Sequence, residues 1–322
     1  MQAVRVHEGG ELRFEQVADP EPPPGWAVVE LRAAGLNRRD LLVSKGVYPF
    51  PLPLIPGSDG AGIRRDTGAE VAILPSLHWG HDQRAPGPEF EILGGPTNGT
   101  YAELVAVPAD CLFPRPRHLS WVEAAALPLA ALTAYRALVV RGELTSRDTA
   151  LILGAGSGVS TFAVQLAAQA GARVLVTSSS DEKIARAVEL GAEAGFRYDE
   201  GDWPQAVLDA TGGRGADVVL DSVGTTWADS ARAAARGGRI VVFGATGGTE
   251  VTVQIRPVYL EWKSFVGTTM GSPTDFAAVL RLVDEARWRP VVDSVFPLAE
   301  AVAAQERLTG DHFGKIALAV SD

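Results

Sequence analysis

Residues 149–183, TALILGAGSGVSTFAVQLAAQAGARVLVTSSSDEK, decide the fold of this chain. The apolar run Leu151–Leu153 predicts a buried strand, and three glycines follow it between 154 and 158. Apolar residues then recur at helical spacing as far as Gly171, which ends the helix, and a second strand covers 173–177. This order presents backbone N–H groups at a helix N-terminus to a pyrophosphate. It predicts a dinucleotide-binding enzyme.

The end of the second strand indicates which dinucleotide is bound. An NAD-binding unit usually carries Asp or Glu about 20 residues after the glycines, to hold the ribose 2′-hydroxyl. Here Ser178 stands at that distance, no carboxylate appears before Asp181, and Lys183 is close by. Hydroxyl groups and a cation suit a 2′-phosphate, so we expect NADPH, contacted by Ser178 and Lys183. Ser180 can also be the N-cap of the next helix, and both roles are compatible.

The composition is typical of a globular protein with two domains. The chain has 322 residues, of which 46% are hydrophobic and 21% charged, and its net charge is −10. This charge, without a basic tract, argues against nucleic acid and anionic membranes as partners. We see neither a secretory signal nor an apolar run of about 20 residues. The single cysteine excludes intramolecular disulfides, so a cytoplasmic location is the default expectation.

The pattern of predicted elements changes near residue 117. Residues 1–115 are rich in strands and prolines, whereas strands and helices alternate from about 117 onward. Strands are expected at 150–154, 173–177, 195–198, 217–221, 239–244 and 264–268. This alternation predicts a doubly wound parallel sheet. The final strands, at 291–298 and 314–320, need a partner surface, and we expect them to return to the first domain.

Two further segments carry expectations of their own. Residues 76–100 form a long polar loop, and such loops are usually functional or disordered. Residues 249–255, TEVTVQI, alternate in a way that suits an edge strand.

Seven blocks along the chain resemble one family in order. They are AAGLNRRDLLVSKGVYP (33–49), PGSDGAG (56–62), LPLAALTAYRAL (127–138), GAGSGVSTFAVQLAAQAGARV (154–174), DSVG (221–224), FGATGG (243–248) and HFGKIAL (312–318). The chain resembles the medium-chain dehydrogenase/reductases, specifically the zinc-independent quinone oxidoreductase branch, which is zeta-crystallin-like. The resemblance implies an α/β fold. A GroES-like, β-rich catalytic domain would cover 1–117, completed by 259–322, and a doubly wound Rossmann domain that binds NADP would cover 118–258.

The resemblance also implies that no metal is bound. Asn37 stands where zinc-dependent relatives carry a cysteine ligand, and Ser58 stands where they carry a histidine. Their third ligand and their structural-zinc cysteines are missing as well, because Cys111 is the only cysteine. His78, His81 and Asp82 are an alternative metal site, but the Trp79-Gly80 pair and the flanking Pro and Gly favour solvated loop histidines instead.

The chain departs from the family pattern at two positions. Ser160 replaces the usual third glycine of the cofactor turn, and its small side chain is compatible with close helix–strand packing. Arg39 replaces the serine that relays the alcohol's proton in zinc-dependent relatives. Without zinc and without this relay, oxidation of an alcohol is disfavoured.

Tyr48 and Asn37 are the candidate catalytic groups. A reductase without zinc suits acceptors that are already activated, so a proton donor or an oxyanion stabiliser would help. By resemblance to enoyl-thioester reductases, Tyr48 would protonate the product, although it can equally pack against the prolines at 49–56. Asn37 would lie near the nicotinamide and donate from its amide to a carbonyl. Its alternative role is that of a turn residue after Gly35.

The resemblance carries over a larger set of cofactor contacts. They are Thr133, Ser157, Gly158, Val159, Ser160, Ser178, Lys183, Tyr198, Val223, Gly244, Ala245, Gly314 and Lys315. Gly314 and Lys315 would close over the cofactor, and Tyr198 is equally plausible as an aromatic residue at a strand end.

The sequence therefore predicts an NADPH-dependent oxidoreductase that transfers hydride to a quinone or an α,β-unsaturated carbonyl without metal. An enoyl-thioester reductase and a non-catalytic NADPH-binding protein remain alternatives. The expected partner is a small-molecule carbonyl or quinone substrate, without nucleic acid or membrane. Relatives commonly form homodimers through the last strand of the cofactor sheet, so a homodimer is expected.

Overall fold

The computed structural model describes residues 1–321 and divides into two units. The first unit contains Met1–Leu132 together with the segment from Gly271 onward, and the second contains Thr133–Met270. In the described part of the chain, no helix is both long enough and apolar enough to cross a membrane.

Both unit boundaries lie further along the chain than residues 117 and 258, where the sequence suggested them. The difference follows from packing and strand pairing. Helix α2 (Trp121–Ala126) packs on strands of the first unit, and strand β15 (Ser264–Gly267) pairs with a strand of the second.

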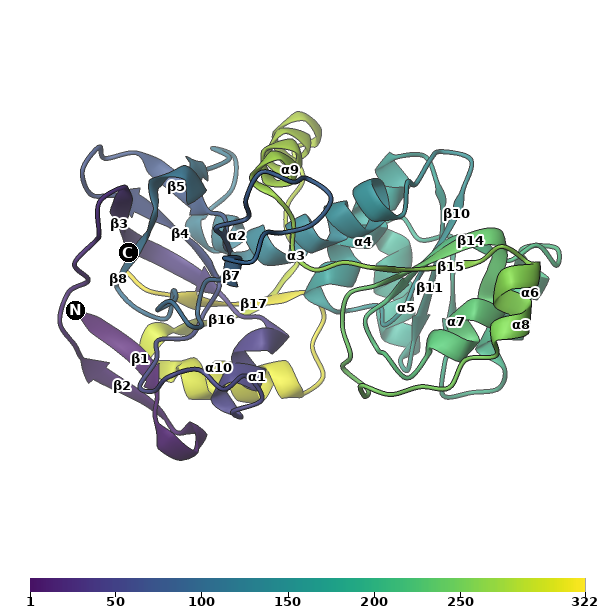
Figure 1. Ribbon diagram of the computed structural model, residues 1–322, viewed down its shortest axis with the longest axis horizontal. Coiled ribbons are helices and arrows are strands. Elements are labelled where there is room, and N and C mark those ends of the chain that lie inside the picture. Colours follow the sequence, from purple (N-terminus) through teal and green to yellow (C-terminus); the bar gives the residue numbers. More distant parts are fainter. Residues whose placement is uncertain (322) are drawn as a thin grey trace. The chain divides into compact units, whose positions relative to one another are not determined.

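The second unit is built around a six-stranded parallel sheet (Figure 1). Its strands are β10 (Thr149–Ile152), β11 (Arg173–Ser178), β12 (Ala194–Arg197), β13 (Ala216–Asp221), β14 (Ala234–Val242) and β15. They lie in the order β12-β11-β10-β13-β14-β15, and every neighbouring pair is parallel. This is the order of a doubly wound dinucleotide-binding sheet. The predicted parallel sheet, including its sixth strand, is confirmed.

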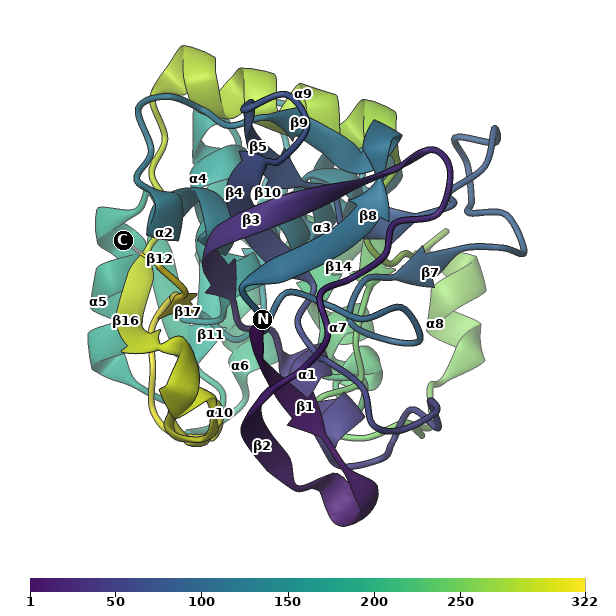
Figure 2. The same ribbon diagram turned by 90° about the vertical axis from the view of Figure 1, so that its left-hand side faces the viewer.

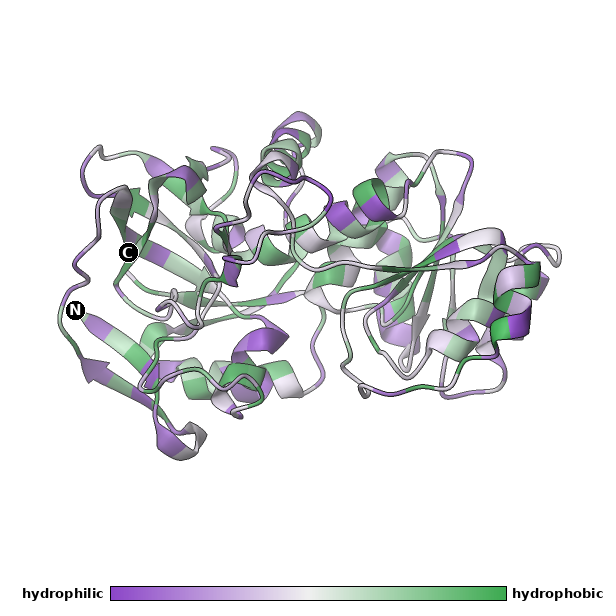
Figure 3. Ribbon diagram, in the orientation of Figure 1, coloured by the Kyte–Doolittle hydropathy of each residue, from purple (hydrophilic) through white to green (hydrophobic). Residues whose placement is uncertain are grey.

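Helices cover both faces of this sheet. They are α4 (Gly158–Gln169), α5 (Asp181–Glu189), α6 (Trp203–Ala210), α7 (Trp227–Ala233) and α8 (Ile255–Leu260). Helices α4 and α5 lie on one face, and α6 and α7 lie on the other (Figure 1). The central strands bury Leu151, Val219 and Ile240, against which Trp203 packs. Apolar residues accordingly gather along these strands (Figure 3).

The first unit is dominated by a mostly antiparallel sheet. Its strands are β3 (Trp26–Gly35), β4 (Asp59–Arg64), β5 (Glu70–Ile73), β8 (Leu104–Pro108), β9 (Leu112–Pro114), β16 (Val292–Pro297) and β17 (Lys315–Ala319). The main path is β16-β17-β3-β4-β5-β9, and β8 pairs with β3, beside which it runs in Figure 2. Because β17 pairs antiparallel with β3, the expected return of the C-terminal strands to the first domain is confirmed.

Smaller elements complete the first unit. They are the hairpin β1 (Gln2–Val6) and β2 (Leu12–Gln16), the pair β6 (Ser76–Leu77) and β7 (Glu91–Ile92), and the helices α1 (Arg38–Ser44), α9 (Pro273–Ala286) and α10 (Ala301–Thr309). The expected helix near 121–141 is present but interrupted, since α2 ends before Pro128 and α3 (Pro128–Tyr135) begins there. A π-helix, Arg136–Arg141, follows it.

The prediction of an edge strand at 249–255 is wrong. Residues 249–254 are irregular, and α8 begins at Ile255. In the part of the chain that the structure describes, residues 249–254 pair with no strand, and β15 is the last strand of the sheet. Pro257 also suits the first turn of a helix better than a strand.

Candidate functional site

The glycine turn of the second unit has the geometry of a pyrophosphate site. Gly154 and Gly156 have φ values of 71° and 112°, a region that glycine enters at little cost. Ser157 is the N-cap of α4, and its Oγ accepts a hydrogen bond from the Ser160 N–H at 3.1 Å. Gly158 and Val159 are the first residues of α4 and are half-buried. The N-terminus of α4 thus offers N–H groups and the positive end of the helix dipole to an anion.

Ser160 fits the position that a glycine occupies in the usual motif. Its side chain is buried, and its hydroxyl lies 2.9 Å from the carbonyl oxygen of Gly154 and 3.0 Å from that of Ser157. The Ser157 hydroxyl contacts it at 2.9 Å. The substitution therefore links the turn to the first helical residues without opening it.

The loop after β11 contains the residues expected to meet the 2′-phosphate. Ser178 is buried, and its Oγ accepts from the Ser180 N–H at 3.2 Å. Ser180 is the N-cap of α5 and accepts from the Lys183 N–H at 3.3 Å. The capping role is therefore present. Tyr198 hydrogen-bonds through its N–H to the Ser178 carbonyl at 3.1 Å, and its side chain is exposed.

Arg197 adds a cation next to this loop. It is the register partner of Ser178 across the sheet, and sequence reasoning missed it. Its guanidinium pairs with Asp199, Glu200 and Asp181 at 2.9, 3.0 and 3.4 Å. An anionic ligand would therefore compete with these exposed carboxylates for Arg197.

The ends of β13 and β14 are joined at the same edge of the sheet. The Gly247 N–H donates to the Val223 carbonyl at 2.8 Å, which holds the loop containing Gly244 and Ala245 beside Val223. Asp221, part of the DSVG block, is fully buried and organises this edge. Its carboxylate accepts from the N–H groups of Val223 and Gly224 and from the hydroxyls of Thr226 and Ser230.

Three residues of the first unit form a buried polar network: Asn37, Asp59 and Lys315. Lys315 Nζ donates to Asn37 Oδ1 at 2.6 Å, to the Leu36 carbonyl at 2.7 Å and to Asp59 Oδ2 at 3.0 Å. Asn37 Nδ2 donates to the same Asp59 oxygen at 2.9 Å, and Asp59 Oδ1 accepts from the Leu129 N–H at 2.7 Å. The two charges orient the Asn37 amide, with its oxygen toward the ammonium and its nitrogen toward the carboxylate.

The partners of Lys315 come from distant elements. Asn37 is the N-cap of α1, Asp59 begins β4 and Lys315 begins β17. Gly314, with φ of 104°, precedes Lys315, and a Cβ there would collide with the Val291 carbonyl. From the sequence, Lys315 was expected to act on the cofactor, and Asp59 had no role. The contacts of Lys315 with Asn37 and Asp59 are not visible along the chain, because these residues are far apart in sequence.

Asp40 adds a second buried carboxylate next to Asn37. Its Oδ2 accepts from the Asn37 N–H at 2.8 Å and from the Tyr101 hydroxyl at 3.1 Å, whereas its Oδ1 has no partner within residues 1–321. Burial raises the pKa of Asp40 to about 6, and the Asn37 N–H opposes this shift. The pKa of Tyr101 is raised as well, mainly by burial and secondly by the nearby Asp40 carboxylate. Tyr101 is therefore a neutral donor that fixes Asp40.

Tyr48 lies beyond the C-terminus of α1 and is 40% exposed. Its hydroxyl has no hydrogen-bond partner in the described chain, and no hydrogen bond joins it to Asn37. Its ring stacks on Phe50, with centroids 6.0 Å apart, and the Arg39 guanidinium lies 5.6 Å from it. The phenol is thus free, and its ring is held by an aromatic residue and a cation. Thr133, in α3, is buried in the second unit.

The positions of the zinc ligands do not fit a metal ion. The Ser58 hydroxyl donates to the Leu93 carbonyl at 2.7 Å, and the Lys315 ammonium already contacts Asn37 and Asp59. Cys111 is buried, and burial raises its pKa to about 12. Among residues 1–321 no group of three His, Cys, Asp or Glu side chains could hold a metal ion, so His78, His81 and Asp82 do not form such a group.

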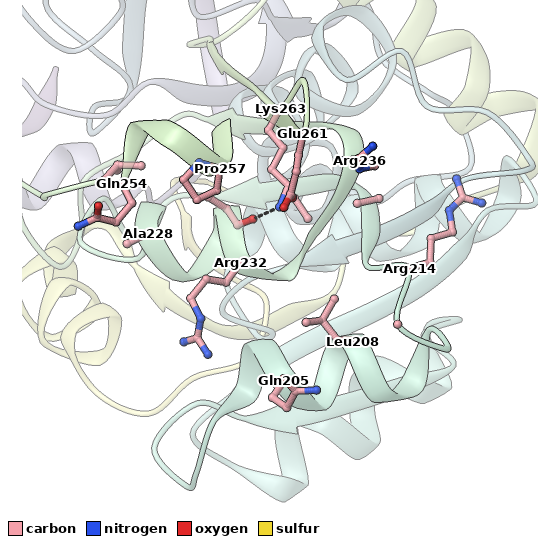
Figure 4. Close-up of a pocket in the computed structure, with 15 residues that line it drawn as sticks. Gln205, Leu208, Arg214, Ala228, Arg232, Arg236, Gln254, Pro257, Glu261 and Lys263 are labelled. Carbon is pink, nitrogen blue, oxygen red and sulfur yellow. Dashed lines mark hydrogen bonds and ion pairs between the residues drawn. The ribbon is translucent and has the colours of Figure 1, made fainter. Parts of the chain in front are cut away.

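A cavity of about 700 Å³ lies elsewhere in the second unit (Figure 4). It is lined by α6, α7, α8 and the first residues of β14, at the opposite ends of the strands from the glycine turn. Three of its four cations are already paired: Arg214 with Asp217, Arg232 with Asp202 and Asp229, and Lys263 with Glu261. It is therefore separate from the candidate site.

Comparison with known proteins decides the family. The alcohol dehydrogenase GroES-like domain matches residues 23–117, and the zinc-binding dehydrogenase domain matches residues 158–285. A zinc-type alcohol dehydrogenase-like protein of Schizosaccharomyces pombe is 36% identical, over 96% of this chain and 95% of its own length. The chain belongs to the medium-chain dehydrogenase/reductase family. It therefore has a GroES-like domain and a Rossmann-like domain, as the sequence predicted, and is an oxidoreductase with a fold that binds a nicotinamide dinucleotide.

Two other members illustrate the range of this family. A quinone oxidoreductase of Mus musculus is 28% identical, over 95% of this chain and 93% of its own length. A solved structure described as an NAD-dependent alcohol dehydrogenase is 39% identical, covers both chains fully and superposes with a TM-score of 0.94. The described activities of these relatives differ, so the acceptor and the form of the cofactor must be argued from this chain's own residues.

Proposed function

We propose that this chain is an NADPH-dependent reductase of quinones or α,β-unsaturated carbonyls that works without metal, in the zinc-independent quinone oxidoreductase branch. The observation that carries the proposal is the network of Asn37, Asp59 and Lys315, in which Asn37 stands where the resemblance places a cysteine ligand of zinc-dependent relatives. The buried Lys315 ammonium repels a divalent cation, and it pairs with the Asp59 carboxylate. In this proposal the Lys315 ammonium supplies the positive charge that a zinc ion supplies in zinc-dependent relatives.

The same network prepares Asn37 to bind an acceptor. The amide has two N–H groups on Nδ2, of which Asp59 takes one. The other remains to donate to a carbonyl oxygen, and Lys315 and Asp59 prevent the amide from flipping. An oriented donor of this kind stabilises negative charge that develops on the oxygen.

Tyr48 is the proposed proton donor. NADPH supplies a hydride when bound, and the conjugated oxygen or carbon of the acceptor then needs a proton. Tyr48 is partly exposed and its hydroxyl has no partner among the residues described, so its proton is available. Tyr101 is excluded from this role because it is fully buried on Asp40.

The proposed NADPH contacts are those that the sequence predicted. Ser157, Gly158, Val159 and Ser160 would hold the pyrophosphate, and Ser178 and Lys183 the 2′-phosphate. Thr133, Tyr198, Val223, Gly244 and Ala245 complete the set. Gly314 and Lys315 belong to the proposed set as well, and the Lys315 ammonium donates to three acceptors of the first unit, among them Asn37. A free carboxylate at the end of β11, which would favour NADH, is absent from the sequence.

A homodimer is the proposed assembly. Strand β15 pairs only with β14 in the described chain, so its other edge carries unpaired backbone groups. The adjacent helix and turn expose large apolar side chains, namely Ile255, Tyr259, Leu260 and Trp262. A second copy that pairs its β15 with this edge would cover both features. Sedimentation at micromolar concentration tests this, and a single monomeric species would contradict it.

The decisive experiment measures oxidation of NADPH and of NADH with a simple para-quinone and with an acyclic enone, before and after dialysis against a chelator. We expect faster turnover with NADPH and no loss after dialysis. Activity that disappears on chelation and returns with zinc would overturn the proposal. Tight NADPH binding without turnover of either acceptor would instead support the thioester reductase or a non-catalytic role.

A further inference from the structure

Arg39 is a cation without a carboxylate partner in the described part of the chain. It lies on α1, one residue before Asp40, and its guanidinium is partly buried. Nη2 donates to the Gly95 carbonyl at 2.7 Å and to the Ile92 carbonyl at 3.3 Å, and Nη1 donates to the Gly94 carbonyl at 3.3 Å. Three neutral oxygens of one loop segment therefore replace the water around this charge.

The other side of the guanidinium meets two aromatic rings. Its central carbon lies 5.6 Å from the ring centroid of Tyr48 and 5.6 Å from that of Phe50. The two rings stack with an interplanar angle of 22°. Both distances lie within the range of a cation–π contact. A single guanidinium thus connects the aromatic pair to the 92–95 segment.

Phe50 and the 92–95 segment are also in direct contact. A Cβ added at Gly95, whose φ is 149°, would lie 2.5 Å from two ring carbons of Phe50. The ring therefore packs on the Gly95 backbone, whose carbonyl oxygen receives the shortest hydrogen bond of Arg39. Arg39, Phe50 and Gly95 therefore contact one another, and the Tyr48 ring stacks on Phe50.

We propose that Arg39 is a positioning residue that holds the stacked Tyr48–Phe50 pair as a platform for planar quinone acceptors. This inference rests on the proposed function and specifies its acceptor class. A stacked pair with one partly exposed member offers an aromatic face, to which a flat ring adds by offset stacking. An acyclic enone offers no such face and gains little from the platform.

The fork of the guanidinium, rather than its charge alone, is what the geometry requires. Three carbonyls accept from two nitrogens of one planar group, whose central carbon lies 5.6 Å from each ring centroid. A lysine ammonium is a point charge with a tetrahedral donor set and cannot reproduce this arrangement. Burial lowers the pKa of Arg39, which agrees with a cation held away from solvent. Arginine nevertheless stays protonated under ordinary conditions.

The test compares Arg39→Gln and Arg39→Lys with Arg38→Gln as the matched control. Arg38 is the neighbouring residue of α1, is exposed and has no hydrogen bond or ion pair within residues 1–321. With NADPH saturating, we expect both Arg39 variants to raise KM for a naphthoquinone about tenfold, since stacking contributes roughly the energy of one decade. KM for an acyclic enone should change by less than about twofold. Arg38→Gln should match the wild type with both acceptors.

Hydrogen exchange provides a readout that does not depend on turnover. The amides of 92–95 and of 47–50 should exchange faster in Arg39→Gln and at wild-type rates in Arg38→Gln. Phe50→Leu, which leaves Arg39 intact, should raise KM for the quinone without raising KM for the enone. This variant keeps the proposal testable if the Arg39 variants do not fold.

The outcomes separate this inference from the proposed function. If the wild type reduces quinones and the Arg39 variants keep its ratio of quinone KM to enone KM, the platform is refuted while the function stands. An Arg39→Lys enzyme with wild-type kinetics would likewise refute the requirement for the fork. If the wild type reduces no quinone, the proposed function fails and the acceptor assignment fails with it.

Discussion

Lys315 and Asn37 are 278 positions apart in the chain, and their side chains meet at 2.6 Å in the core of the first unit. The ammonium of Lys315 is almost fully buried and is neutralised by Asp59, whose carboxylate is fully buried. The contact joins β17 to Asn37, the N-cap of α1, whose amide is proposed to bind the acceptor.

Replacement of Lys315 by Met should be strongly destabilising. It leaves the Asp59 charge buried and unpaired, and breaking a buried pair in this way costs about 3–5 kcal/mol. The double variant Lys315→Met/Asp59→Asn removes both charges and should recover at least about 1 kcal/mol of that loss. Urea unfolding monitored by circular dichroism measures both values. A double variant that is less stable than Lys315→Met would contradict the assigned ion pair.

Asp40 should make the stability of the protein depend on pH in an unusual direction. Because burial raises its pKa from 3.8 to about 6, folding favours the protonated form. The contribution to stability is fully present below pH 3.8 and is lost as the pH rises through 6. The free energy of unfolding of the wild type should fall relative to Asp40→Asn by about 2 kcal/mol between pH 4 and 7.

Urea titrations of both proteins across this pH range measure the difference. A constant difference would mean that Asp40 does not change its protonation state there. Glu193→Gln is a suitable control, since the pKa of Glu193 is lowered by Arg173 and its pH dependence has the opposite sign.

Ser178→Asp should shift the preference from NADPH toward NADH. The new carboxylate would repel a 2′-phosphate and accept from the 2′-hydroxyl of NADH. We expect NADPH affinity to fall by about 10–100-fold, that is, by one or two steps of 1.4 kcal/mol. Ser178→Ala removes the hydroxyl without adding charge and separates the two effects. Dissociation constants from nicotinamide fluorescence measure the change, and equal losses for both cofactors would contradict the assignment.

Cys111 should be inert in the folded protein. It is the only thiol in the chain, it is buried, and burial raises its pKa to about 12. Because the thiolate is the nucleophile, a disulfide reagent at pH 8 should label less than one thiol per chain until denaturant is added. Rapid labelling of the native protein would show that this part of the first unit opens readily.

Local sequence was sufficient wherever the physics is local. Ser157 and Ser180 cap the helices that follow them, and the glycines before α4 adopt the left-handed backbone that only glycine tolerates well. The failed edge strand at 249–255 marks the limit of this approach. Alternation of apolar residues indicates which side chains could face a core, but a strand also needs a pairing partner, and residues 249–254 pair with no strand in the described chain.

The sequence by itself determined the cofactor turn, the parallel sheet and the family, because these depend on spacing within a few dozen residues and on short motifs kept in order. Only the tertiary structure decided which residues the buried charged side chains contact. Lys315 pairs with Asn37 and Asp59, and Arg39, which had no role in the sequence, connects Tyr48 to the 92–95 segment. A buried charge takes whichever partners folding brings to it. Those partners come from other strands and loops, so no local sequence pattern predicts them.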